Sequence, residues 1–205
     1  MIKNIVFDMG QVLIHWSPRQ FTSFLELTET DAALVEQELF RSVEWVRLDR
    51  GTITEEDAIV SVCRRLPEHL HDCAAQLITG WWKWPLIPME DMAELIKELK
   101  SMGFGIFLLS NASLGLHEYF HRIPGAEYFD GKIVSSDHKF LKPQAEIYHT
   151  LYRSFNLNPA ECVFIDDVPA NIDGAMMTGM QGLVFYGDVA RLRRELQALG
   201  INVTQ

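Results

Sequence analysis

The hydrophobic and polar positions divide the chain into two unlike regions. Over residues 17–84 the apolar side chains recur at helical spacing. From Met89 onward, helical stretches alternate with short apolar runs of the kind that form buried strands. The predicted strands are the first segment, 2–8, and the later runs 105–109, 132–135, 162–165 and 182–186.

Residues typical of helix starts and helix ends support the helices predicted in both regions. Ser17 followed by Pro18 is typical of a helix start, and Thr54 with Asp57 has the spacing of a capping box. In the second region, a helix is predicted to end at Gly103, and two more are predicted over 143–155 and 169–178. We expect Pro143 to open the first of these two helices.

This alternation predicts an α/β fold, a doubly wound, Rossmann-like parallel sheet with helices on both faces. The first strand has to join the sheet across the helical region, which is therefore an insertion. We expect residues 1–14 and 89–205 to form the α/β core and residues 15–88 to form an α-helical cap domain.

Composition narrows the class of protein. The 205 residues are 48% hydrophobic and 22% charged, which is enough to bury a substantial core. The net charge of −10, without any basic run, argues against nucleic acid or an anionic membrane as a partner. The three cysteines match no metal or redox motif, and neither a leader segment nor a membrane-spanning run is visible. We therefore expect a cytoplasmic protein with reduced thiols.

Polar residues follow the predicted strands where those strands end. Because the carboxyl ends of parallel strands meet at one edge of a sheet, these side chains should lie together. Adjacent carboxylates repel each other unless a cation lies between them, so the set implies a divalent metal. The set is Asp8, Ser110, Asn111, Asp166 and Asp167, with Lys142 in a nearby loop.

Taken singly, most of these residues have a structural interpretation. An Asp after a strand often caps the next helix, Ser and Asn are common turn residues, and a lysine is usually solvated. Asp8 is different, because an apolar strand gains nothing from ending in an unpaired, partly buried charge. The hypothesis of a shared functional site therefore rests on the order in which all these residues occur along the chain, and not on any one of them.

With these motifs the chain resembles the haloacid-dehalogenase-like hydrolases. The matching segments are FDMGQVL at the first strand, LLSN at the second, LKP around Lys142, and FIDDVPANIDGA at the fourth. The helical region corresponds to the cap that one branch of the family inserts after the first strand. Within that branch the motifs are most similar to those of sugar-phosphate phosphatases of the glucose-1-phosphatase type.

The resemblance implies a Mg²⁺-dependent phosphatase that acts on a small phosphomonoester. The expected substrate is a sugar phosphate, such as a hexose 1-phosphate. Asp8 would be the nucleophile and form an aspartyl-phosphate. Ser110 and the Asn111 N–H would bind the transferring phosphoryl group, while Lys142 neutralises charge beside Asp8. The implied metal ligands are Asp8, the Gly10 carbonyl, Asp167 directly and Asp166 more weakly or through water, with Asn171 tethering the loop.

Gly10 departs from the commonest family pattern. Two residues after the nucleophile that pattern has a second Asp, which protonates the leaving group and later activates water. Loss of such a group typically slows a reaction by about 10²–10⁴-fold. Two explanations remain open: the leaving group needs little help, as in a sugar 1-phosphate, or another residue such as His15 moves the proton. For His15 itself, a packing role at the hinge is the stronger interpretation.

Gly10 also bears on the alternative functions. A phosphosugar mutase depends on the missing Asp, so it is disfavoured. A metal-independent 2-haloacid dehalogenase also lacks that Asp, but it has no use for the Asp166–Asp167 pair. A third hypothesis is a catalytically silent binding module on the same fold. The retained Ser110, Lys142 and Asp167 argue against it, since a scaffold has no reason to keep all three.

Substrate choice is expected to lie in the cap. Its aromatic residues either stack on a sugar and close the site or, as is more common, pack within the cap. Two acidic residues, Glu44 and Asp49, are candidates for bonding sugar hydroxyls, although helix surfaces carry such charges routinely. The aromatic candidates are Trp45, Trp81, Trp82 and Trp84.

Overall fold

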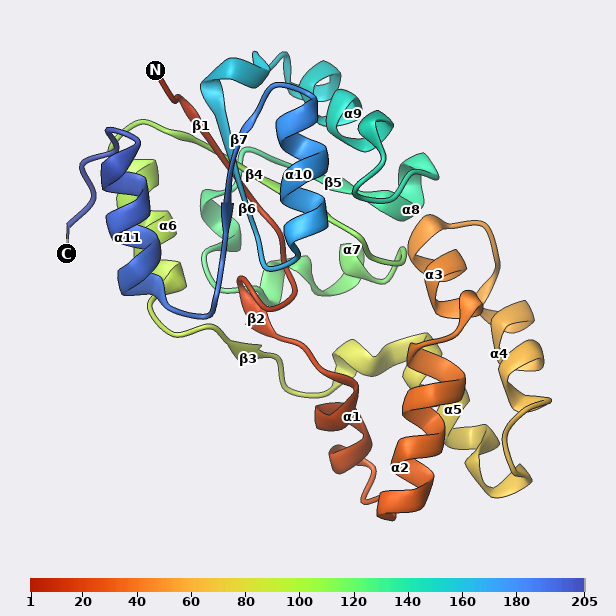
Figure 1. Cartoon of the computed structure of the whole chain (residues 1–205). Coiled ribbons are helices and arrows are strands. Elements are labelled where there is room, and N and C mark those ends of the chain that lie inside the picture. The colour runs from red at the N-terminus through yellow and green to blue at the C-terminus, as the bar shows by residue number, and fades with distance from the viewer. Residues whose placement is uncertain (205) are drawn as a thin grey trace.

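The computed structural model describes residues 1–204 and is built around a five-stranded parallel sheet (Figure 1). The strand order is β5-β4-β1-β6-β7, so the chain runs outward from β1 first in one direction and then in the other. The doubly wound sheet predicted from the sequence is therefore confirmed, with strand ends shifted by at most two residues. The strands are β1 (Asn4–Phe7), β4 (Gly105–Ser110), β5 (Gly131–Val134), β6 (Cys162–Asp166) and β7 (Gln181–Val184).

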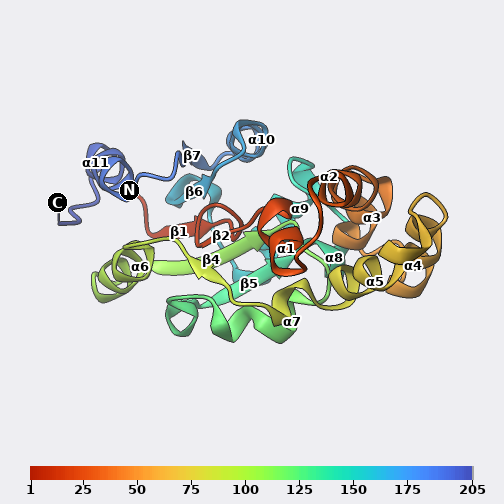
Figure 2. The same cartoon turned by 90° about the horizontal axis from the view of Figure 1, so that it is seen from below.

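Helices cover both faces of this sheet (Figures 1 and 2). Side chains of a strand alternate between its faces, so Ile5 and Phe7 pack in one hydrophobic cluster and Val6 packs in another. The cluster of Ile5 and Phe7 includes α6 and α11, and that of Val6 includes α9 and α10. These helices are α6 (Met92–Ser101), α9 (Ala145–Phe155), α10 (Pro169–Met177) and α11 (Val189–Ala198).

Several short helices lie in the connections between the core strands. One correction applies to the predicted helix over 143–155, because α9 begins only at Ala145 and Pro143 lies before it. Pro169, in contrast, is the first residue of α10, as predicted. The remaining short core helices are α7 (Leu116–Tyr119), η4 (Phe120–Arg122), η5 (Ala126–Tyr128), α8 (Ser135–His138) and η6 (Pro159–Glu161).

Residues 16–86 form a separate group of helices beside the carboxyl ends of the strands (Figure 1). The predicted helix starts are confirmed: the Ser17 side chain accepts a hydrogen bond from Gln20 N, and that of Thr54 accepts one from Asp57 N. The helices are α1 (Pro18–Phe24), α2 (Glu29–Val35), η1 (Glu36–Phe40), α3 (Val43–Arg50), α4 (Glu55–Cys63), η2 (Glu68–Leu70), α5 (His71–Gly80) and η3 (Trp81–Lys83).

Two short strands mark where the chain leaves the core and returns to it. These are β2 (Ile14–His15) and β3 (Ile87–Pro88), which pair antiparallel. One continuous hydrophobic cluster joins the helical insertion to the face of the sheet that carries Phe7.

Among residues 1–204, none of the helices has the length and apolar character needed to cross a membrane.

Candidate active site

Three adjacent strands place the predicted site residues side by side. Asp8 directly follows β1, Ser110 ends β4 on one side of it, and Asp166 ends β6 on the other. All three side chains are buried, with residue exposures of 8%, 1% and 0%. The carboxyl edge of a doubly wound sheet is where such folds bind ligands, and these side chains mark that edge here.

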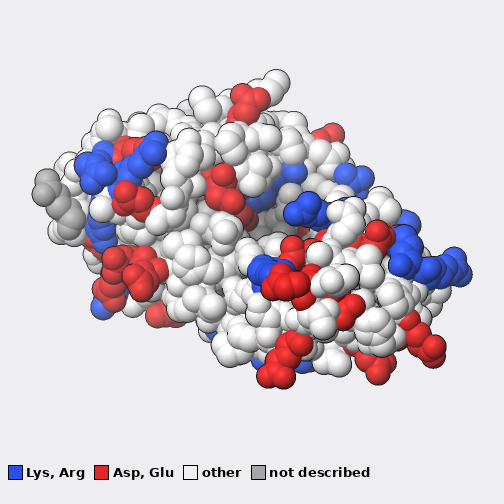
Figure 3. All heavy atoms as spheres, turned by 60° about the horizontal axis from the view of Figure 1, so that its bottom comes forward, with Lys and Arg blue, Asp and Glu red and all other residues white. Residues whose placement is uncertain are grey.

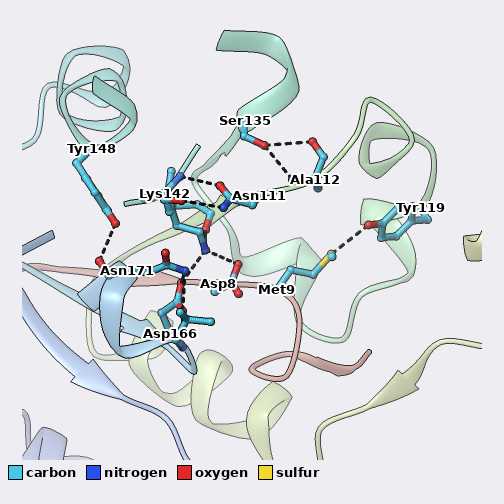
Figure 4. Close-up of polar contacts among 12 residues, drawn as sticks. Asp8, Met9, Asn111, Ala112, Tyr119, Ser135, Lys142, Tyr148, Asp166 and Asn171 are labelled. Carbon is cyan, nitrogen blue, oxygen red and sulfur yellow. Dashed lines mark hydrogen bonds and ion pairs between the residues drawn. The ribbon is translucent and has the colours of Figure 1, made fainter. Parts of the chain in front are cut away.

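Lys142 lies at the centre of the group (Figure 4). Its Nζ is 2.7 Å from Asp8 Oδ1 and 2.7 Å from Asp166 Oδ2, and it also donates a hydrogen bond of 3.0 Å to the Leu109 carbonyl. The lysine side chain is almost fully buried. A buried ammonium with two carboxylate partners stays charged, and these partners raise the pKa of Lys142 against the opposing effect of burial.

Asn111 holds the backbone of Lys142 in place. Asn111 Nδ2 donates to the Lys142 carbonyl at 3.1 Å, and Lys142 N donates to Asn111 Oδ1 at 2.8 Å. The side chain of Asn111 therefore positions the lysine. This contact was not predicted from the sequence, because it joins residues 31 positions apart.

Asp166 is surrounded by hydrogen-bond donors from the protein. Besides Lys142, Val168 N donates to Asp166 Oδ1 at 2.8 Å, and Asn171 Nδ2 lies 3.1 Å from each carboxylate oxygen. Tyr148 then donates to the Asn171 carbonyl at 2.6 Å. Asn171 thus ties the start of α10 to the end of β6, which is the tethering contact expected from the sequence.

Asp167 stands beside Asp8 and Asp166 and is only half-buried. Carboxylate oxygens of these three residues lie within 4.8 Å of one another. Hard oxygen donors in this number suit Mg²⁺, which typically takes one or two carboxylates together with waters and phosphate oxygens. Because both oxygens of Asp166 already accept hydrogen bonds from the protein, the donor set fits a metal held mainly by Asp8 and Asp167.

Burial dominates the electrostatics of Asp8. Desolvation raises its pKa from 3.8 to about 6, Lys142 opposes this rise, and Asp166 adds to it. Burial and the neighbouring Asp166 raise the pKa of Asp167 as well. When ionised, the three carboxylates beside the single Lys142 leave net negative charge at this edge of the sheet, which favours a bound cation.

A cavity of about 210 Å³ opens above Asp8, between the core and the helical insertion. The molecular surface is hollowed between the two parts, with charged side chains around the hollow (Figure 3). Ligand pockets typically span about 300–1,000 Å³, so this cavity suits a small substrate. It is lined by Asp8, Met9, Gly10, Trp16, Trp45, Asp49, Trp81, Ser110, Asn111, Ala112, Ser113, Tyr119, Lys142, Val168 and Asn171.

Only some of the predicted insertion residues reach this cavity. Trp45, Trp81 and Asp49 line it. Trp82 instead stacks on Tyr119 and donates to Glu118, and Trp84 stacks on Phe24. These two tryptophans therefore have packing roles. Glu44 likewise lies away from the cavity and pairs with Arg65 at 2.8 Å.

His15 does not line the cavity either. It is an exposed residue of β2, opposite Ile87 of β3. Sequence reasoning missed Trp16, the next residue, whose ring packs against Trp45 and Trp81 at centroid distances of 5.9 and 6.0 Å. It also missed Tyr119, whose hydroxyl lies 3.3 Å from Met9 Sδ. No motif signalled either aromatic residue.

Comparisons with known proteins agree with this architecture. The chain is 27% identical over 205 residues to a sesquiterpene phosphatase of Aspergillus oryzae, covering 97% of each chain. A mutant of a HAD family enzyme of Bacteroides thetaiotaomicron, solved with magnesium and inorganic phosphate, superposes with a TM-score of 0.70 at 21% identity, covering 94% of this chain and 99% of that one. The L-2-haloacid dehalogenase of Xanthobacter autotrophicus gives a TM-score of 0.66 at 20% identity, covering 99% and 85%.

At these identities the two solved structures show the fold alone. The family assignment rests on a different match, since residues 2–176 fit the haloacid dehalogenase-like hydrolase family. This span contains all four motifs and every site residue described above. The chain therefore belongs to the haloacid dehalogenase-like hydrolases.

Proposed function

We propose that this protein is a Mg²⁺-dependent phosphatase that hydrolyses a small phosphomonoester through an aspartyl-phosphate on Asp8. The observation that carries the proposal is the position of Lys142 Nζ, 2.7 Å from both Asp8 and Asp166, at the floor of the cavity. A fixed ammonium there stabilises a phosphoryl group during its transfer to Asp8.

The chemistry follows from the residues around Asp8. Its carboxylate attacks phosphorus in line with the departing oxygen, and water later hydrolyses the acyl phosphate. Ser110 and the backbone N–H of Asn111 bind the phosphoryl oxygens, and Lys142 neutralises charge between the phosphate and Asp8. A bound Mg²⁺ would supply further neutralisation of phosphate charge, held by Asp8, Asp167 and the Gly10 carbonyl, with Asp166 more weakly involved.

The insertion would act as a cap over this chemistry. We assign residues 1–14 and 89–205 to the core and residues 15–88 to the cap. The β2–β3 pair supports this division because it joins the two crossing segments at their boundary. A cap that closes over the site excludes water from the acyl phosphate until the leaving group has departed.

For the substrate we propose a sugar phosphate such as a hexose 1-phosphate. Trp45 and Trp81 line the cavity, where an aromatic ring can stack on the apolar face of a sugar. The cavity volume of about 210 Å³ also favours a small leaving group. An anomeric oxygen leaves more readily than an ordinary alcohol, which suits a site with glycine at position 10.

The phosphate of an apolar alcohol is the second candidate. Trp16, Trp45, Trp81 and Tyr119 give the cavity an aromatic wall, and the similar Aspergillus oryzae protein is named a sesquiterpene phosphatase. Such a wall binds an apolar group through burial alone, without polar partners. The two candidates differ in whether hydroxyl groups on the substrate strengthen or weaken its binding.

A screen of phosphomonoesters with Mg²⁺ tests the proposal and ranks these candidates. The panel should contain sugar 1-phosphates, sugar 6-phosphates, nucleotides and prenyl monophosphates, together with 2-haloacids. We expect turnover of phosphate esters that EDTA removes and Mg²⁺ restores. Turnover that is indifferent to EDTA, or a preference for 2-haloacids, would instead favour the metal-independent dehalogenase, which has no use for Asp166 and Asp167.

A further inference from the structure

Gly10 leaves the floor of the site without a side chain that can donate a proton. The helical insertion contributes one carboxyl group to the lining of the cavity. This group belongs to Asp49, near the end of α3. Asp8 lines the same cavity from the core side. In an in-line displacement the leaving oxygen lies on the side of phosphorus away from the nucleophile, which here is the side of the insertion.

We propose that Asp49 is the general acid and general base of this site, replacing the family's second Asp from the opposite wall of the cavity. This inference rests on the proposed phosphatase function. It assigns a catalytic role to a residue of the insertion that lies 41 positions after the nucleophile in the sequence.

Contacts with the core hold Asp49 in place. Ser135 of α8 donates from its Oγ to the Asp49 carbonyl at 2.5 Å. The same Oγ accepts from Ala112 N at 2.9 Å, and Figure 4 shows Ser135 beside Ala112. Ala112 directly follows Ser110 and Asn111, the residues proposed to bind the phosphoryl group. The Ser135 hydroxyl therefore joins the end of α3 to the loop that follows β4. A catalytic carboxyl group needs such a fixed backbone.

Gly51 brings α3 close to the core. It caps the helix with a φ of +69°, and a Cβ at this position would collide with the Ser136 carbonyl. The left-handed turn and the close approach both require glycine. Together with Ser135, Gly51 fixes the backbone at the end of α3 against the core.

The electrostatic surroundings of Asp49 suit a proton donor. Burial is the main cause that raises its pKa well above 3.8, and the charge of Asp8 raises it further, while the backbone N–H of Ser113 opposes this rise. Besides Asp8 and Lys142, the other titratable group that lines the cavity is Tyr119, from α7 of the core. Burial, Asp49 and Asp8 raise the pKa of Tyr119 well above 10, so its phenol holds its proton more tightly than a carboxyl group does.

The proposed cycle balances in protons and electrons. In the first step an Asp8 oxygen bonds to phosphorus, the bond from phosphorus to the ester oxygen breaks with its electron pair on that oxygen, and the Asp49 carboxyl proton moves to it. The alcohol leaves and Asp49 becomes a carboxylate. In the second step water bonds to phosphorus as Asp49 takes its proton, and the bond from phosphorus to Asp8 breaks. Phosphate, the Asp8 carboxylate and the Asp49 carboxyl group are the products.

The test compares wild type with Asp49→Asn, an almost isosteric variant, on a series of substituted phenyl phosphates with graded leaving-group pKa. Wild type should show a shallow dependence of kcat/KM on leaving-group pKa, and the variant a steep one. Esters with the poorest leaving groups should lose about 10²–10⁴-fold, the range expected for general acid catalysis. With p-nitrophenyl phosphate the variant should release a burst of nitrophenolate and then turn over slowly, because hydrolysis of the acyl phosphate also needs Asp49.

The controls separate this inference from the proposed function. Asp57→Asn removes an exposed carboxylate of the insertion, and His15→Ala removes the alternative proton donor suggested by the sequence. Both variants should keep the wild-type dependence of kcat/KM on leaving-group pKa.

Asp49→Ala provides a second variant, in which added formate should partly restore turnover of the poor leaving groups. Parallel slopes for wild type and Asp49→Asn, without a burst, would overturn the role of Asp49 alone. Absence of phosphatase activity in wild type, or full activity in Asp8→Asn, would overturn the proposed function and this inference with it.

Discussion

Lys142 Nζ lies 2.7 Å from Asp8 Oδ1, with side-chain exposures of 1% for the lysine and 12% for the aspartate. The lysine reaches Asp8 from a loop 134 residues later in the chain. This pair links the chemistry to the stability of the fold, because both charges are largely removed from bulk water.

Replacing Lys142 by methionine should destabilise the protein strongly. The variant leaves Asp8 and Asp166 as buried carboxylates without their cation, and breaking a buried ion pair from one side typically costs about 3–5 kcal/mol. Urea unfolding at neutral pH measures this loss. Lys97→Met, at an exposed position of α6, is the matched control and should change stability little. Equal unfolding midpoints for the two variants would contradict the central role of the lysine.

The raised pKa of Asp8 predicts a pH-dependent loss of stability in the metal-free protein. Burial raises this pKa from 3.8 to about 6, so between these values the unfolded chain releases a proton that the folded chain keeps. The Asp8 contribution therefore weakens folding as pH rises through this window, by about 3 kcal/mol in total. Below it both states are protonated, and above it both are ionised.

Asp8→Asn removes this titration. In EDTA the variant should gain stability relative to wild type as pH rises from about 4 to 7, measured as the free energy of unfolding in urea. Asp57→Asn, whose carboxylate is exposed, should track wild type across the same range. A stability difference between Asp8→Asn and wild type that does not change with pH would contradict the buried, shifted carboxyl group.

Metal binding should depend more on Asp167 than on Asp166. Mg²⁺ that binds only the folded state raises Tm with concentration. Asp167→Asn should abolish this rise, because Asp167 is the half-buried carboxylate beside Asp8. Asp166→Asn should lower Tm itself, because it disturbs the contacts to Lys142, Val168 and Asn171, but should retain a weaker response to Mg²⁺. A full Mg²⁺ response in Asp167→Asn would refute this division of roles.

The aromatic wall of the cavity should control substrate affinity. Trp45→Ala removes a ring that lines the cavity, and we expect KM to rise by about 10-fold or more with kcat less affected. Trp84→Ala removes a ring that stacks on Phe24 outside the cavity and should leave KM near the wild-type value. Steady-state kinetics on the best substrate from the screen compares the two. If both variants raise KM equally, the wall does not bind the leaving group.

The strand ends can be predicted from the sequence because each is marked locally by a polar residue that ends an apolar run. Asp8, Ser110 and Asp166 each follow an apolar run, and parallel strands bring such positions to one edge. The fold class and the helical insertion follow from periodicity in the same way. Pro143 shows the limit, because a residue that can open a helix need not be its first residue.

The cavity wall was harder to predict because it depends on how the insertion packs against the core. Asp49 resembles any acidic residue of a helix until Ser135 and Gly51 place its end of α3 over the site. Trp45 and Trp84 look alike in the sequence, yet only Trp45 faces the cavity. His15 is the reverse case, close to Asp8 in sequence but exposed on β2.

The central claim is that Asp8 carries the phosphoryl group between the two steps. Its most direct test is an acid-quenched single turnover of a phosphomonoester with Mg²⁺, followed by proteolysis and mass spectrometry of the peptide that contains Asp8. We predict one phosphoryl group on Asp8, labile to hydroxylamine as an acyl phosphate is, and increased in Asp49→Asn, where hydrolysis is slowed. A phosphoryl group on another residue, or a turnover that proceeds at the wild-type rate in Asp8→Asn, would contradict the account.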